Sequence, residues 1–158
     1  MTRSSSLKAF RWLQIGTLSA VLLFIGLVLL SGLGTLLATN IYQPAITAEG
    51  KAVTLSMGYH SLNPGPFSTD SVVISVSVVD VNRSVLLSAA PQSFKVGAFA
   101  IASGNLTFAL DFSQLPEATF EAFRNSTTPL TLNVGISSGL DGLVSVEMTT
   151  RLTISGVE

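Results

Sequence analysis

The chain has 158 residues, of which 47% are hydrophobic and 11% charged, with a formal net charge of −1 and no cysteine. Globular proteins usually carry about 25% charged residues, so part of this chain is expected to lie outside water. The lack of cysteine excludes disulfides, thiolate catalysis and cysteine-based metal sites. Residues 43–158 carry nine acidic and five basic side chains, and this acidic balance argues against nucleic-acid binding.

Residues 13–38 form an apolar run without Asp, Glu, Lys, Arg or His. A helix of about 20 apolar residues crosses the hydrocarbon core, so this run predicts a single transmembrane helix. Basic residues precede it without an acidic one: Arg3, Lys8 and Arg11. The positive-inside rule therefore predicts that residues 1–12 are cytoplasmic and that the chain beyond the helix lies outside the cell membrane.

Two other interpretations of the run stay open. A cleaved secretory signal would have an apolar region of about 7–15 residues ending in small residues, whereas this run is longer and ends in Leu36-Leu37-Ala38. A pilin-type leader would be cut after Ala9, but it would leave Arg11 and Gln14 in the filament core. Within the run, Gly16 and Ala20 lie four residues apart and are a candidate contact for a second membrane helix.

Beyond a predicted linker at residues 39–48, apolar and polar residues alternate, as in half-buried antiparallel strands. We predict an extracytoplasmic domain over residues 49–158 that contains one short helix at residues 116–124. The predicted strands cover residues 53–59, 72–81, 85–88, 94–101, 106–112, 130–136 and 144–154. Seven such strands predict an all-β fold, an immunoglobulin- or fibronectin-like antiparallel β-sandwich. Residues 72–81 are apolar on both faces, which indicates either burial or an interface with another protein.

The turn Asn63-Pro64-Gly65-Pro66-Phe67 follows the first long strand, and an alternating Leu-Thr-Phe-Ala-Leu-Asp-Phe strand follows at residues 106–112. This arrangement resembles the late-embryogenesis-abundant group 2 domain, also called the water-stress (WHy) domain, over about residues 46–156. The resemblance implies a small β-sandwich, membrane-anchored in several members, that is associated with stress protection rather than catalysis. It supplies no catalytic motif to carry over.

Candidate catalytic and metal-binding residues are few. His60 is predicted to face solvent at a strand end, and no nucleophile motif accompanies it to form a triad. Two glutamates of the short helix, Glu117 and Glu121, are expected to be solvated. Four aspartates at predicted strand ends lack the spacing of a calcium loop, namely Asp70, Asp80, Asp111 and Asp141. We therefore expect no enzyme activity, metal, cofactor or small-molecule substrate.

Three Asn-x-Ser/Thr sequons, at Asn82, Asn105 and Asn125, are candidate N-glycosylation sites in the predicted outward domain. Together these features predict a noncatalytic single-pass protein that contacts the bilayer and a protein partner, as an accessory or binding subunit of a cell-envelope or membrane complex. A stress-protective domain without a fixed partner and a pilin-like filament subunit are the alternatives.

Overall fold

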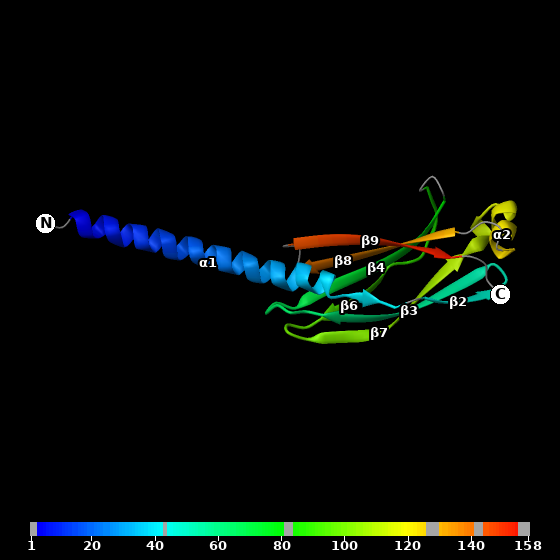
Figure 1. Ribbon diagram of the computed structural model, residues 1–158, viewed down its shortest axis with the longest axis horizontal. Coiled ribbons are helices and arrows are strands. Elements are labelled where there is room, and N and C mark those ends of the chain that lie inside the picture. The colour runs from blue at the N-terminus through cyan, green and yellow to red at the C-terminus, as the bar shows by residue number, and fades with distance from the viewer. Residues whose placement is uncertain (1–2, 43, 81–83, 126–129, 141–143, 155–158) are drawn as a thin grey trace.

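The structure is a computed structural model in which a long helix leads into an antiparallel β-sandwich (Figure 1). It describes residues 3–42, 44–80, 84–125, 130–140 and 144–154. The elements in chain order are α1 (Arg3–Leu37), β1 (Asn40–Ile41), β2 (Ala45–Glu49), β3 (Ala52–Leu62), β4 (Thr69–Val79), β5 (Val85–Ser88), β6 (Gln92–Val96), β7 (Ile101–Asp111), the 3-10 turn η1 (Phe112–Gln114), α2 (Glu117–Arg124), β8 (Leu130–Leu140) and β9 (Val144–Ile154).

The strands form two antiparallel sheets. In the first sheet, β3 lies at the centre, with β7 on one side and with β1 and β2 on the other. In the second sheet, β4 pairs with β8 on one side and with β5 and β6 on the other, and β9 pairs with β8. This arrangement confirms the predicted all-β sandwich with one short helix.

The core lies between the two sheets and is built from alternate residues of the long strands. Fully buried members are Leu55, Met57, Val72, Ile74, Val76, Phe108, Leu110 and Leu132. The second face of β4 is also covered, because Val79 is buried and Val73 is half-buried. Burial inside the fold therefore accounts for the apolar residues on both faces of this strand.

The helix α1 is long and apolar enough to span a membrane over Arg11–Leu37. Its side chains are exposed all round from residue 11 to residue 26, but from Val28 onward one face is buried against the sandwich. Leu36 belongs to the main hydrophobic core and is 2% exposed. Part of the predicted transmembrane segment is therefore also part of the domain.

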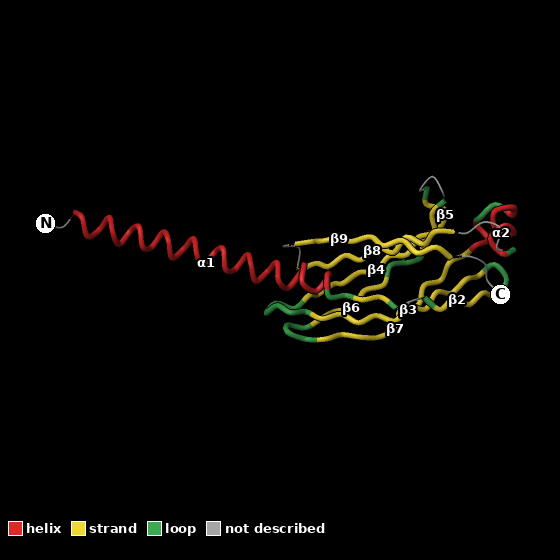
Figure 2. Tube along the Cα trace, in the orientation of Figure 1, coloured by secondary structure: helices red, strands yellow, loops and turns green. Residues whose placement is uncertain are grey.

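Residues 39–48 are not an irregular linker. They contain β1 and most of β2, and both strands pair with β3 (Figure 2). The helix therefore continues into the first sheet almost directly, with Thr39 N–H hydrogen-bonded to Leu36 O at 3.2 Å. The alternation in this stretch is too short to predict a strand, and only pairing with β3 reveals it.

The single strand predicted at residues 94–101 is two strands, since residues 94–96 belong to β6 and Ile101 begins β7. The chain turns over residues 97–100 between β6 and β7, and Phe99 has a left-handed φ of 50°. As a result, β7 begins at Ile101 rather than at residue 106. The strand predicted at residues 130–136 is longer, because β8 continues to Leu140; residues 141–143 lie outside the described part of the chain.

Replacing Leu36 with Ala should destabilise the whole domain, because the side chain fills a buried site in the core. We expect a loss of about 2–4 kcal/mol in the free energy of unfolding. Leu37 is the matched control, since it is 69% exposed and its replacement should change stability by about 0.5 kcal/mol or less. Thermal unfolding of both variants in detergent measures the difference. Equal melting temperatures would show that α1 is not part of the core.

Candidate functional site

A row of small hydroxyl residues lies on one face of the last turns of α1. Ser31, Thr35 and Thr39 are spaced four residues apart and are all buried. Each side chain donates a hydrogen bond to the carbonyl of the residue four positions earlier, which satisfies the hydroxyl within the helix. Because these side chains are short, the helix backbone can approach the sandwich closely on this face.

The same hydroxyls also make hydrogen bonds across to the sandwich. Thr35 Oγ1 lies 3.1 Å from Thr69 Oγ1 at the start of β4, and Thr39 Oγ1 lies 2.8 Å from Ser61 Oγ in β3. Each residue of these two pairs is at least 94% buried. A buried polar group that lacks a hydrogen-bond partner costs free energy, because it has lost its contact with water. The two pairs therefore hold α1 in one orientation on the domain.

The turn at residues 63–67, between β3 and β4, is one part of the surface on which α1 packs, and strands β8 and β9 form most of the rest of it. The fully buried Asn63 organises it: its Oδ1 accepts from Gly65 N–H at 2.9 Å, and its Nδ2 donates to Phe67 O at 2.7 Å. Phe67 N–H donates to Ser31 Oγ at 3.1 Å. The Phe67 ring packs edge-on against Phe24, with centroids 5.6 Å apart.

Gly65 lies directly against the backbone of α1. A Cβ at this position would lie 2.0 Å from Ser31 Oγ and 2.6 Å from Ser31 Cα. Gly34 of the helix faces Pro64 in the same way, with a Cβ position 2.7 Å from Pro64 Cγ. The Asn-Pro-Gly-Pro-Phe turn is therefore the seat of the helix, a role that the sequence analysis did not assign to it. The four-residue spacing of Ser31, Thr35 and Thr39 is the signal that could have indicated it.

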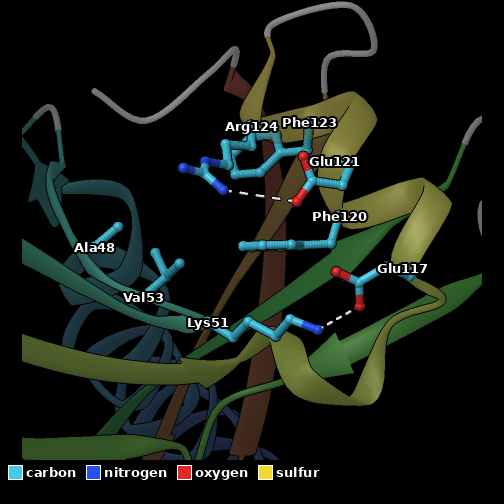
Figure 3. A pocket seen from close by; sticks show the side chains of 9 residues that line it. Ala48, Lys51, Val53, Glu117, Phe120, Glu121, Phe123 and Arg124 are labelled. Carbon is cyan, nitrogen blue, oxygen red and sulfur yellow. Dashed lines mark hydrogen bonds and ion pairs between the residues drawn. The ribbon is translucent and has the colours of Figure 1, made fainter.

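A second candidate site lies at the opposite end of the sandwich, beneath α2 (Figures 1 and 3). It is a cleft of about 450 Å³, lined by residues from β2, β3, α2 and the turn between β2 and β3. The cleft floor includes Phe120 and Phe123, and both rings pack on the buried Phe112 of η1, Phe123 with a centroid distance of 5.4 Å.

The charges around this cleft are paired with one another. Lys51 Nζ makes an ion pair with Glu117 and lies 5.4 Å from the centre of the Phe120 ring. Arg124 lies 3.6 Å from Glu121 one turn earlier on α2 (Figure 3). Because these pairs are at least partly exposed, they contribute little to stability. The cleft offers an aromatic floor with a charged rim.

The structure does not bring the candidate acidic residues to one place. Asp70 faces Lys95 at 3.8 Å, near the end of the sandwich that receives α1. Asp80 and Asp111 lie towards the other end, where they accept from Ser84 N–H and Ser113 N–H respectively. Asp141 lies outside the described residues. In the part of the chain that is described, no three His, Asp or Glu side chains group as a metal site would.

The remaining predicted residues are spread over the molecule. His60 lies within β3, half-buried, opposite Asn40 and Ser103 in the neighbouring strands. Gly16 and Ala20 lie on the exposed part of α1, where a Cβ on Gly16 would meet no atom within 4 Å. The helix contact predicted for them remains a prediction.

The three sequons differ in their surroundings. Asn105 is exposed in the middle of β7, not at the start of a strand, and Asn125 is exposed directly after α2. Asn82 lies outside the described residues. Glycosylation of all three remains a prediction.

No protein-family model matches the chain, and no curated protein matches its sequence. Similar solved structures include an Archaeoglobus fulgidus protein, 8% identical, covering 76% of this chain and 96% of that one, with a TM-score of 0.49. A solution structure from Arabidopsis thaliana is 9% identical, covering 74% and 80%, with a TM-score of 0.48. A Bacteroides fragilis structure described as a β-galactosidase is 17% identical, and the match covers 74% of this chain and 16% of that one, with a TM-score of 0.48. These values carry no inference about function.

Replacing Gly65 with Ala should weaken the seat of the helix, because the new methyl group would overlap Ser31. We expect a loss of about 1–3 kcal/mol in the free energy of unfolding. Gly26→Ala is the matched control, since that position is open and Ala favours a helix. Thermal unfolding of both full-length variants in detergent is the measurement, and an unchanged melting temperature for Gly65→Ala would contradict the packing described here.

The hydrogen bonds of Asp111 predict that the stability of the protein decreases in acid. Hydrogen bonds from the Ser113 side chain and backbone lower the pKa of this carboxyl below its ordinary value of 3.8. A carboxyl whose pKa is lower in the folded state than in the unfolded state stabilises the folded protein at pH values above its unfolded-state pKa. This contribution to stability is lost as the pH falls through the folded-state pKa. Asp111→Asn keeps an acceptor for Ser113 but cannot titrate, so its stability should fall less than that of the wild type below about pH 4.

Urea unfolding at a series of acidic pH values compares the two proteins. Glu49→Gln provides the control, because it removes an exposed carboxylate without touching η1. If Asp111→Asn and Glu49→Gln change the pH dependence of stability equally, the hydrogen bonds to Asp111 are not the cause of the acid sensitivity.

Proposed function

We propose that this chain is a noncatalytic, single-pass membrane protein whose sandwich is held outside the cell membrane as an accessory or binding subunit of a larger membrane or envelope complex. The observation that carries the proposal is the division of α1 into two parts. Residues 12–26 are largely apolar and exposed on every side, as a helix in lipid is, whereas the last turns of α1 are buried against the domain. The basic residues Arg3, Lys8 and Arg11 before the apolar run support a cytoplasmic N-terminal segment.

The seat of the helix supports a role in positioning. Buried hydroxyl pairs, the Gly65 contact and the core residue Leu36 fasten the domain to α1 without a flexible linker. A domain fastened in this way keeps one orientation relative to the bilayer. It can therefore present a binding surface to a partner at a fixed distance from the membrane. The α2 cleft lies at the end farthest from α1 and is the surface that we propose for the partner (Figure 1).

A stress-protective role of the water-stress type is the second candidate, favoured by the Asn63-Pro64 turn that carries the resemblance. Here that turn is occupied by α1, with Phe67 N–H bonded to Ser31. A protective domain would be expected to act without its anchor, whereas removal of α1 from this chain would expose the seat and empty the Leu36 site. The two functions therefore predict opposite results for a chain without the helix. A protective domain would keep its activity, but an anchored accessory subunit would lose its role.

The native mass of the full-length protein, extracted from its own membranes in mild detergent, tests the proposal. We expect a stoichiometric assembly with other chains, identified by mass spectrometry, and an intact N-terminal segment. Migration as a monomer or homo-oligomer would contradict the accessory role. Loss of residues 1–9 from the intact mass would instead favour the filament subunit.

A pair of arginine substitutions tests the proposed partner surface. Ala118 is exposed on α2 and Ser93 is exposed on β6, so a large side chain fits at either position without disturbing the core. Ala118→Arg should reduce partner recovery severalfold, while Ser93→Arg should leave it unchanged. The reverse result would place the partner on the second sheet rather than at the cleft.

A further inference from the structure

The end of the sandwich that receives α1 carries an exposed apolar surface. We call the four side chains Leu62, Phe67, Phe99 and Ile101 the apolar tip. Phe99 is 69% exposed and Ile101 is 62% exposed, and Leu62 lies opposite Ile101 in the pairing of β3 with β7. Phe67 joins this surface to the helix through its contact with Phe24. The apolar tip is therefore continuous with the exposed apolar surface of α1.

The two segments that carry the apolar tip contain no charge. Residues 61–69 and residues 96–110 lack Asp, Glu, Lys, Arg and His. Asp70 follows the first segment and Lys95 precedes the second, and their charged groups lie 3.8 Å apart. The turns between β3 and β4 and between β6 and β7 reach back beside the last turns of α1, toward its N-terminal end (Figure 1).

The turn at residues 63–67 also has no free backbone donor. Asn63 N–H donates to Ala100 O, Gly65 N–H donates to Asn63 Oδ1, and Phe67 N–H donates to Ser31 Oγ. Pro64 and Pro66 have no N–H to satisfy. On the neighbouring turn, Phe99 N–H donates to Gly65 O at 3.0 Å. Hydrocarbon tolerates a loop only when its polar backbone groups are satisfied within the protein, and the backbone donors of the turn at residues 63–67 are satisfied in this way.

Phe99 holds a conformation that is unfavourable for its type. Among the described residues it is the only one other than glycine with a positive φ, at 50°. A bulky residue in the left-handed region is rare and strained, and the exposed ring gains little from packing inside the protein. Such an outlier indicates that the outward position of the ring serves a contact beyond the chain.

The length of α1 identifies that contact. Arg11 is the last charge before the apolar run, and Phe24 is in contact with the domain through Phe67, so residues 12–23 separate the two. These residues rise only about 18 Å as a helix. The hydrocarbon core is about 30 Å thick, so the helix beside the apolar tip must also lie in lipid.

We propose that the apolar tip enters the outer leaflet beside α1 and contacts lipid acyl chains, so that the domain meets the bilayer at two points. This proposal rests on the proposed membrane anchoring of α1. The immersed turns add an apolar, uncharged surface to the helix, and they resist tilting of the sandwich relative to the membrane. The α2 cleft at the far end is thereby held away from the bilayer.

The absence of cysteine allows the proposal to be tested with single nitroxide labels on the full chain in vesicles of phosphatidylcholine and phosphatidylglycerol. Labels are placed at Ala98→Cys beside Phe99, at Leu22→Cys in α1 and at Ala118→Cys on α2. Collision with oxygen reports lipid, and collision with a water-soluble nickel chelate reports water. We expect Ala98→Cys to behave like Leu22→Cys, with collision with the nickel chelate reduced severalfold relative to Ala118→Cys.

Phe99→Asp, added to Ala98→Cys, should return the label to water. Val85→Asp is the matched control, because Val85 is an exposed apolar residue on β5, away from α1, and its change should leave the label in lipid. A label at Ala98→Cys that meets the chelate as freely as Ala118→Cys, while Leu22→Cys stays protected, overturns the proposal but keeps the anchor. Protection from both reagents would indicate a protein contact and also overturns it. Access of the chelate to Leu22→Cys would contradict the anchoring itself.

Discussion

The contact between Gly65 and Ser31 sets the distance between α1 and the sandwich, and the other contacts at this end depend on that distance. A larger residue at position 65 would press on Ser31 and strain this contact. The Thr35–Thr69 and Thr39–Ser61 hydroxyl pairs and the buried Leu36 lie on the turns of α1 that follow Ser31, so they depend on the same close approach. Backbone proximity of this kind is available to glycine alone, so the helix and the domain form one folded unit.

This union gives the molecule two different ends. At one end, uncharged turns lie beside the helix, and the backbone donors of the turn at residues 63–67 are satisfied, which supports the proposed contact with lipid. At the other, α2 covers an aromatic floor ringed by Lys51, Glu117 and Arg124, which suits contact with a polar partner in water. The long strands β3, β4 and β7 connect the two ends, so their length sets how far the cleft stands from the proposed membrane surface.

Much of the fold could be predicted from the sequence because its pattern is local. The alternation in residues 53–59 is a direct consequence of one strand face being buried, and Pro116 marks the start of α2. The predicted strand at residues 94–101 failed because apolar residues continue through the turn. Phe99 and Ile101 are apolar although they face outward, so burial cannot be inferred from them.

By itself, the sequence determined that a charge-free apolar run at residues 13–38 precedes an all-β domain, because hydropathy and alternation are properties of neighbouring residues. It also marked Asn63-Pro64-Gly65-Pro66 as a turn. Only the tertiary structure decided that this turn is the seat of α1, because Ser31 and Gly65 lie 34 positions apart and meet only when the sheets have formed. For the same reason the α2 cleft, assembled from β2, β3 and α2, has no signature in any single segment.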